Sequence, residues 1–245
     1  METFPLPAPA FNGSSQTVAA GNAFEWLRQG WVLFMAYPGQ WIALTVVFLV
    51  IVLGLNIVPL IGTLAAHLLT PLLGAGMLQA CRKVSSGESP DVSDLLAGFK
   101  HNSSPLILLG VFYMAGMLLI LALGFVLGGA SIAGALMSSH PAGLGFAFGG
   151  LLFAMLLSLA VSVPLFMALW FAPALVFFNN MPPLEALKAS FHACLKNTLP
   201  FVVYGLVAMV LMFFAALPVF LGFLVLIPVL SASVFVSYRD IFVAN

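Results

Sequence analysis

The chain has 245 residues, of which 63% are hydrophobic and only 6% are charged. Its mean hydropathy is +1.19. A soluble domain carries about 25% charged residues, so this composition excludes an ordinary water-exposed surface and indicates that lipid is the main solvent. The net charge of zero gives no argument for nucleic acid as a partner.

The first twenty residues read as a tail. They contain Glu2 and three prolines, have no Lys or Arg, and lack a continuous apolar core. A secretory signal needs a basic start and an apolar run of roughly 7–15 residues, so we expect no cleavable signal here. We expect residues 1–20 to be a disordered cytoplasmic tail and residues 21–245 to form one membrane domain.

Six stretches are apolar enough to cross a membrane, which takes roughly 17–25 residues of helix. None shows the alternation that a membrane β-barrel needs. The predicted fold class is therefore all-α, a polytopic membrane helical bundle with three hairpins. The paired spans are 41–57 with 60–80, 105–127 with 148–170, and 199–220 with 221–238; the fourth can run on to residue 178.

The connection 128–145 is the sizeable link on the side opposite the basic residues. It is rich in small residues and glycine and carries no charge. We expect an ordinary flexible loop with His140 and Pro141 as turn residues. A shallow re-entrant loop is the alternative.

All basic residues fall on one side of the membrane that these spans define. Because Lys and Arg near span ends are retained in the cytoplasm, this bias predicts a membrane protein with both termini inside the cytoplasm. Arg28 precedes the first span, Arg82, Lys83 and Lys100 lie between the second and third, Lys188 and Lys196 between the fourth and fifth, and Arg239 follows the sixth.

An internal threefold repeat covers about 22–83, 91–178 and 183–240. Segments 24–31, 92–99 and 184–191 share the pattern apolar-x-x-Leu-x-x-(Gly/Ser)-aromatic before each hairpin, and the middle copy looks shortened. Pro71, Pro164 and Pro228 each lie four residues before an alanine in a second span. Such prolines open substrate sites in some transporters. Their repetition favours a role in how each hairpin packs on its neighbours.

The segment before each hairpin is amphipathic. Phe24, Leu27, Trp31 and Phe34 recur at helical spacing among charged residues. Helices of this kind lie in the membrane interface, and the alternative is that their apolar faces pack on the bundle. Each cation near anionic head groups contributes about 1 kcal/mol. The candidate lipid-interface residues are Trp26, Arg28, Trp31, Trp41, Phe99, Lys188, Phe191 and Lys196.

One segment resembles a known group of membrane proteins. Pro173-Ala-Leu ends a span, and Glu185-Ala-Leu-Lys-Ala-Ser-Phe and then Asn197 precede the next. This order resembles the membrane domain of some glycerophosphoryl diester phosphodiesterases and several uncharacterised bacterial inner-membrane families. The rest of the chain looks like a proteobacterial six-span family. The resemblance implies the fold and a location in the bacterial inner membrane but no site residue, and the chain lacks a phosphodiesterase catalytic domain.

His67 is the titratable group predicted within a span. An ionisable residue at membrane depth indicates a proton relay or a ligand contact, and an interhelical hydrogen bond is the alternative. No phosphate-binding loop, zinc-protease motif or nucleophile elbow occurs, so we expect no enzyme activity. Cys81, His101, His192 and Cys194 have poor zinc spacing, and we expect neither a metal nor a cofactor.

The sequence therefore predicts a non-enzymatic protein that organises lipid or a partner membrane complex through its interfacial helices. The alternative is a small-molecule or lipid transporter with a cavity between hairpins, near His67 and the prolines. A transporter predicts a polar cavity at mid-depth, whereas an organising protein predicts a filled bundle. Membrane lipids are the expected partners, a membrane-protein partner is a second possibility, and the oligomeric state stays open.

Overall fold

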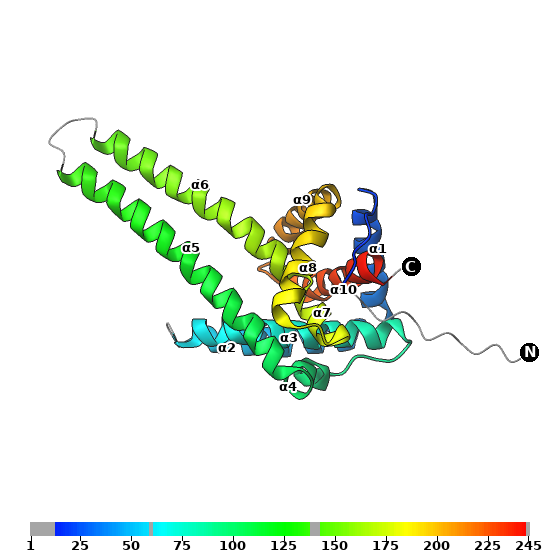
Figure 1. The fold of residues 1–245 in the computed structure, drawn as a ribbon. Coiled ribbons are helices and arrows are strands. Elements are labelled where there is room, and N and C mark those ends of the chain that lie inside the picture. The colour runs from blue at the N-terminus through cyan, green and yellow to red at the C-terminus, as the bar shows by residue number, and fades with distance from the viewer. Residues whose placement is uncertain (1–12, 59–60, 138–142, 244–245) are drawn as a thin grey trace, which may run out of the picture.

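A computed structural model describes residues 13–58, 61–137 and 143–243, and within them every regular element is helical (Figure 1). The predicted all-α class is confirmed. Six helical segments of this part of the chain are long and apolar enough to span a membrane, and each overlaps a predicted span. They are α2 (Pro38–Asn56), α3 (Ile61–Ser85), α5 (Ser103–Met137), α6 (Gly143–Trp170) with α7 (Ala172–Asn179), α9 (Thr198–Ala216) and α10 (Phe223–Phe242).

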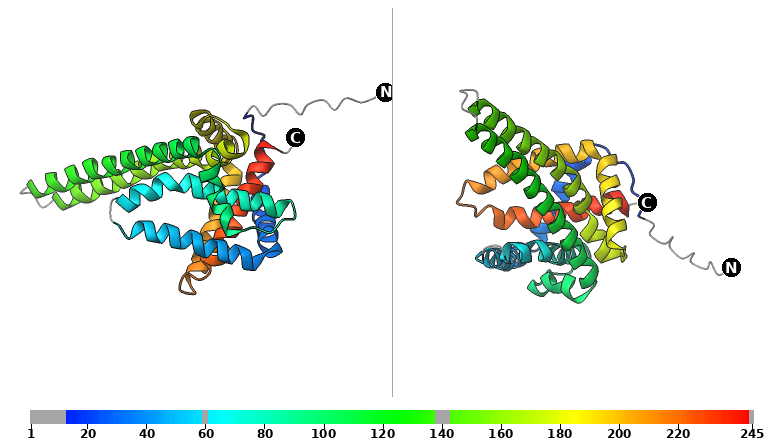
Figure 2. Two further views of the ribbon diagram at one scale, coloured as in Figure 1. Left: turned by 90° about the horizontal axis from the view of Figure 1, so that it is seen from below. Right: turned by 60° about the vertical axis from the view of Figure 1, so that its left-hand side comes forward.

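The remaining elements lie before each hairpin, where the repeated pattern occurs. They are α1 (Asn22–Ala36), η1 (Val92–Leu96) with α4 (Ala97–Lys100), and α8 (Pro183–Lys196). The middle copy is short, with five residues of 3-10 helix and one turn of α-helix. Figures 1 and 2 show three hairpins that diverge from the region where these elements lie, which we call the base.

The predicted loop 128–145 is wrong for most of its length. Helix α5 continues to Met137 and α6 begins at Gly143, while His140 and Pro141 lie outside the described residues. A segment exposed to lipid must pair its backbone groups internally, which favours helix over the glycine-rich loop that composition indicated. At 35 residues, α5 is about 52 Å long and exceeds a hydrocarbon core of about 30 Å.

The base elements connect the hairpins in a ring. Each packs mainly on the second helix of the hairpin that precedes it: η1 and α4 on α3, and α8 on α6. The first copy closes the ring, because α1 packs on α10 of the last hairpin. The three prolines lie inside α3, α6 and α10, the helices that receive these contacts.

The small residue of the repeated pattern lies at each contact. A Cβ atom on Gly30 would lie 2.6 Å from the carbonyl oxygen of Val229, directly after Pro228. A Cβ atom on Gly98 would likewise overlap the carbonyl oxygen of Leu72, directly after Pro71. Only glycine permits this approach of one backbone to another without displacement. The packing therefore gives the repeated glycine a physical role, while the repeat itself stays a prediction.

Ser190 takes the place of glycine in the third copy. Its hydroxyl donates to the Met167 carbonyl oxygen at 2.7 Å and accepts from the Phe171 amide at 2.9 Å. Those two backbone groups would pair with each other if α6 continued unbroken. A side chain inserted into this ladder bends or breaks a helix, and α6 ends at Trp170.

The prediction of a disordered tail is wrong for residues 13–20. The Asn197 side chain accepts from the Val18 amide at 2.9 Å and donates to the Gln16 carbonyl oxygen at 3.0 Å. The Gln16 amide donates to the Ile241 carbonyl oxygen at 2.9 Å. These bonds fasten the segment to the ends of α8 and α10. Residues 1–12 lie outside the described part.

We predict that Gly30→Ala destabilises the protein, by about 1–3 kcal/mol, because the added methyl group overpacks the contact with α10. Thermal unfolding in detergent measures this. Gly54→Ala is the matched control, since no atom lies within 4 Å of its Cβ position in α2. Equal unfolding temperatures for the two variants would contradict the proposed contact.

Candidate lipid-interface surface and polar pocket at the base

Two base helices present an outward stripe with the same spacing. On α1 it consists of Phe24, Arg28, Trp31 and Met35, all exposed. Residues spaced by four, three and four lie on one helix face. On α8 the stripe consists of Leu184, Lys188 and Leu195, which are exposed, and Phe191, which is half-buried.

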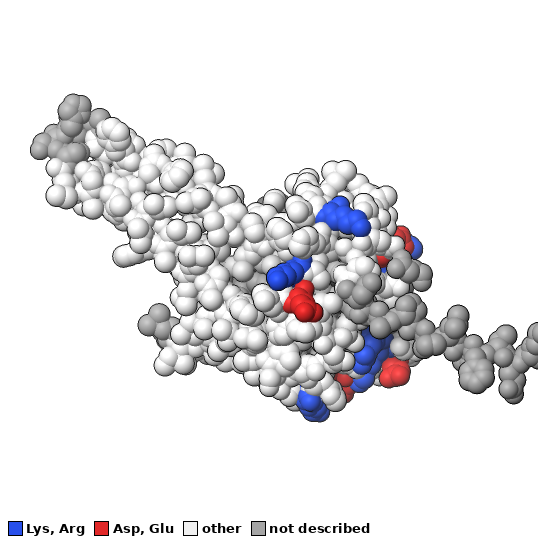
Figure 3. All heavy atoms as spheres, viewed as in Figure 1, with Lys and Arg blue, Asp and Glu red and all other residues white. Residues whose placement is uncertain are grey.

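The middle copy presents a shorter version of the stripe. Val92, Leu96 and Phe99 are exposed at spacings of four and three residues, and the exposed Lys100 follows Phe99. Each of the three copies therefore carries apolar side chains outside the core, next to a cation. Figure 3 shows charged side chains around the base and none on the visible described surface of the α5–α6 hairpin.

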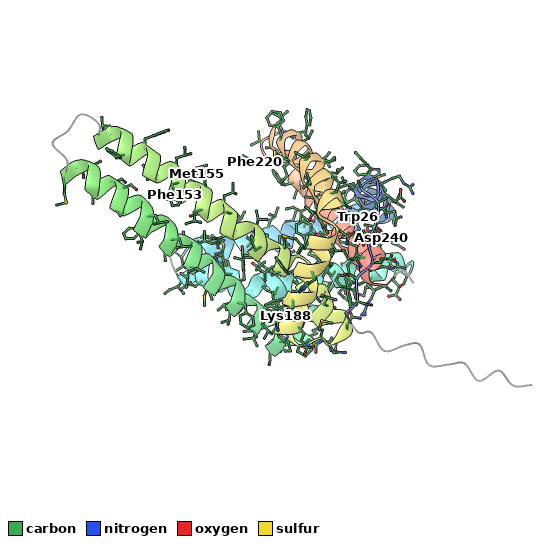
Figure 4. The ribbon with its side chains drawn as sticks, turned by 45° about the horizontal axis from the view of Figure 1, so that its top comes forward. Trp26, Phe153, Met155, Lys188, Phe220 and Asp240 are labelled. Carbon is green, nitrogen blue, oxygen red and sulfur yellow. The ribbon has the colours of Figure 1, made fainter. Side chains whose placement is uncertain are left out.

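Trp26 and Trp41 do not lie on this surface. Trp26 is 1% exposed, and its Nε1 donates to the Asp240 carboxylate at 2.7 Å (Figure 4). Trp41 is fully buried, and its Nε1 donates to the Leu33 carbonyl oxygen at 3.0 Å. Both indoles pack within the protein, so we retain the lipid-interface prediction for the other six residues only.

The alternative that apolar faces pack on the bundle holds for part of α1. Leu27 and Phe34, which the sequence placed on one stripe with Phe24 and Trp31, are buried. On α8 the buried side is made of small residues, including Ala186 and Ala193. Its larger apolar side chains are consequently free to face outward.

The three predicted cations differ in how they are held. The Arg28 guanidinium donates to both carboxylate oxygens of Glu25, at 2.7 and 2.6 Å. This contact lowers the pKa of Glu25 to about 2. The Lys196 ammonium donates to the Ser15 carbonyl oxygen at 2.6 Å. Lys188 is exposed and makes no ion pair with any described residue.

A polar pocket of about 570 Å³ lies at the base between α3, the middle copy and the end of α7. Arg82 and Lys100 supply positive charge, and the Oε1 atom of Gln79 is buried without a donor among the described residues. Lys83 pairs with the buried Asp94 at 2.6 Å and joins η1 to α3. The pocket has the chemistry to hold a small group that is both anionic and hydroxylated.

Sequence reasoning missed the polar side chains that hold the base together. Asn102 donates to the Val176 carbonyl oxygen at 3.0 Å and to the Asn180 side chain at 2.8 Å. Asp240 accepts from Asn22 as well as from Trp26. Two signals were available in the sequence. An asparagine, Asn102 or Asn197, precedes the first span of the second and third hairpins, and the acidic residue Asp240 follows the last span.

His67 lies on the face of α3 that contacts α5. Its Nδ1 is 2.6 Å from the Thr63 carbonyl oxygen, and its ring centroid is 5.0 Å from that of Tyr113. A cavity of about 260 Å³ is lined by Pro71 and Tyr113 but not by His67. Of the three prolines predicted to lie near His67, the structure therefore places Pro71 beside a cavity whose lining residue Tyr113 contacts His67. The lining of this cavity is mainly apolar.

We predict that Trp26→Phe lowers the free energy of unfolding by about 1–3 kcal/mol, because the partly buried Asp240 carboxylate loses a donor. Trp31→Phe is the matched control and should leave stability unchanged, since Trp31 is 48% exposed. Chemical unfolding in detergent compares the two variants. The assignment of Trp26 to the core would be wrong if Trp31→Phe were the more destabilising change.

Comparison with known proteins gives one informative relative. A protein of Burkholderia thailandensis that carries the name probable inner membrane protein is 30% identical over 225 residues, which cover 89% of this chain and 82% of that protein. No family model matches the chain. No solved structure matches it. With six apolar helices and this relative, the chain belongs to a family of multi-pass bacterial inner-membrane proteins.

Proposed function

We propose that this protein is not an enzyme and that it organises lipid or a partner membrane complex through the stripes at its base. The observation that carries the proposal is the outward stripe of α1, α8 and the middle copy, where exposed apolar side chains flank a cation. A helix with this pattern buries its apolar side chains at the boundary between head groups and acyl chains. Its cation then lies near the anionic phosphates.

Lipid is the better supported of the two partners. A stable protein–protein interface buries about 1,200–2,000 Å² in one patch. The stripes are narrow and belong to three separate elements of the base. Such a distribution suits many small contacts with lipid better than one continuous contact with a protein. Lys188, which lacks an ion-pair partner among the described residues, is the strongest head-group contact.

We also propose that the base faces the cytoplasm, with both termini inside. The grouping of basic residues at the base supports this orientation. The order of motifs between residues 173 and 197 supports a further proposal, a distant relationship to the membrane domain of glycerophosphoryl diester phosphodiesterases.

A lipid or small-molecule transporter is the second candidate, because apolar cavities lie between hairpins. The cavity near Pro71 and Tyr113 has about 260 Å³ and is lined mainly by carbon atoms. This lining suits a hydrophobic cargo rather than an ion. If the protein transports such a cargo through that cavity, Gly74→Phe should abolish flux into vesicles, because Gly74 lines the cavity and no atom lies within 4 Å of its Cβ position. If it organises lipid at the base, Gly74→Phe should have no effect on lipid retention.

We predict that Lys188→Gln weakens the retention of phosphatidylglycerol about fivefold, the equivalent of about 1 kcal/mol for one basic residue. Glu25→Gln should strengthen retention, because it frees Arg28 from its carboxylate partner. Mass spectrometry of purified protein counts the retained lipid, and His67→Ala is the control. Unchanged retention in both charge variants would contradict the proposal.

The Glu25–Arg28 pair also predicts a pH dependence. The pKa of Glu25 is lowered to about 2 by Arg28, so the carboxylate stays charged well below its ordinary range. The stabilisation by the pair is present above the unfolded pKa and is lost as the pH falls toward 2. Lipid retention through Arg28 should therefore stay constant between about pH 5 and pH 8. A rise in retention within that window would show that Glu25 is protonated there.

We predict that Ser89→Cys reacts with a membrane-impermeant maleimide only in inside-out vesicles, and that Leu136→Cys reacts in spheroplasts. Both positions are exposed, at the base and near the end of the α5–α6 hairpin. The native thiols of Cys81 and Cys194 should not react with the maleimide, because both are buried and burial raises the pKa of Cys194 to about 12. The reverse labelling pattern would overturn the orientation.

A further inference from the structure

One of the three seams between neighbouring hairpins differs from the other two. At two seams the second helix of one hairpin packs along the first helix of the next, α3 on α5 and α10 on α2. The equivalent pair at the third seam is α6 and α9. Within the described residues these two helices do not pack closely along their length. A groove of about 500 Å³ lies between them instead.

The groove has the chemistry of a hydrocarbon site. Its walls are almost entirely carbon, with Phe166 and Met167 from α6 facing Phe201 and Ala208 from α9. No charged residue or histidine lines it among the described residues. Both walls belong to helices long and apolar enough to span a membrane. The groove is therefore continuous with the lipid-exposed surface, and a membrane lipid can enter it from the side.

Trp170 lies at the base end of the groove. Its ring packs edge-on against Phe201 and Tyr204, with both centroid distances 5.8 Å. Its Nε1 atom is buried and has no acceptor among the described residues. A buried donor without a partner is unfavourable, so an occupant that brings an acceptor oxygen is favoured. The ester and phosphate groups of a phospholipid carry such oxygens next to an acyl chain.

A transmembrane helix from a partner fits less well. Its backbone carbonyl groups are already paired within the helix, so it offers few free acceptors to Trp170. An acyl chain matches the carbon lining, and the ester group at its end supplies an acceptor oxygen.

We propose that the groove between α6 and α9 binds one acyl chain of a membrane phospholipid, with its ester or phosphate oxygens at Trp170. The bound lipid fills the space between α6 and α9 at the third seam. At the other two seams the neighbouring hairpins contact each other directly, α3 with α5 and α10 with α2. The inference depends on membrane insertion alone and not on the stripes of α1 and α8, so either proposal can fail without the other.

The test places a side chain in the groove without removing a native contact. Gly205 lines the groove, and no atom lies within 4 Å of its Cβ position, so Gly205→Phe fills open space. Gly54→Phe is the matched control, because that position on α2 is equally open and outside the groove. The full chain is placed in discs of phosphatidylethanolamine and phosphatidylglycerol. A tracer phosphatidylethanolamine carries a photoactivatable diazirine in one acyl chain.

Cross-links in the wild type should concentrate in residues 163–170 and 201–212. Gly205→Phe should reduce them about tenfold, which corresponds to about 1.4 kcal/mol, while Gly54→Phe should leave them unchanged. Unchanged cross-linking in Gly205→Phe would overturn the proposal. So would a wild type that cross-links no more in the groove than along the exposed face of α2, the pattern of ordinary surrounding lipid.

Trp170→Phe provides a second arm that does not depend on the folding of Gly205→Phe. It keeps an aromatic ring beside Phe201 and Tyr204 and removes the N–H donor. Phospholipid retained after detergent purification should fall about three- to tenfold, the loss of one hydrogen bond. If the variant retains as much phospholipid as the wild type, the Trp170 N–H does not contact the lipid. If Gly205→Phe also fails to fold, that result overturns the proposal.

Discussion

Each base helix can approach its neighbouring hairpin only as closely as its smallest side chain allows. Gly30 brings α1 onto the Val229 carbonyl of α10, and Gly98 brings α4 onto the Leu72 carbonyl of α3. Ser190 makes the equivalent approach of α8 to α6 through two hydrogen bonds. Small residues face inward at these contacts, which leaves part of the larger apolar residues of the same helices, such as Trp31 of α1 and Leu184 of α8, facing outward. The proposed lipid surface therefore follows from the packing that closes the ring.

The ring also explains why polar residues gather at one end of so apolar a chain. Asp240 joins α10 to α1 through Trp26, Asn197 joins α8 to residues 16 and 18, and the Asp94–Lys83 pair joins η1 to α3. Buried polar groups are stable only when they are paired. Pairing is easiest where the chain meets water, so the connections concentrate at the base, and the hairpins beyond it can be almost wholly apolar. Beyond the base, the described residues of the second and third hairpins do not pack along each other, and the groove between α6 and α9 lies between them.

Hydropathy was sufficient to predict the six spans, because the cost of burying an unpaired backbone in lipid leaves helix as the favoured structure. Hydropathy could not predict which side chains contact each other within the fold. Trp26 looked like a membrane anchor, yet its acceptor Asp240 lies 214 positions along the chain. The 128–145 segment looked like a loop because glycine disfavours helix in water, but α5 continues to Met137. The repeated pattern includes Gly30 and Gly98, but it gave no sign that Gly30 meets α10 or that Gly98 meets α3.

The most direct test measures how deep the three stripes lie in a membrane. Spin labels on Trp31→Cys, Phe99→Cys and Phe191→Cys in lipid discs report depth through their collisions with oxygen and with a water-soluble nickel complex. A label on Ser89→Cys, which is exposed at the base, gives the aqueous reference. The account predicts that all three labels lie at head-group depth in the same leaflet. A stripe label as accessible to nickel as the reference, or three labels at unrelated depths, would contradict it.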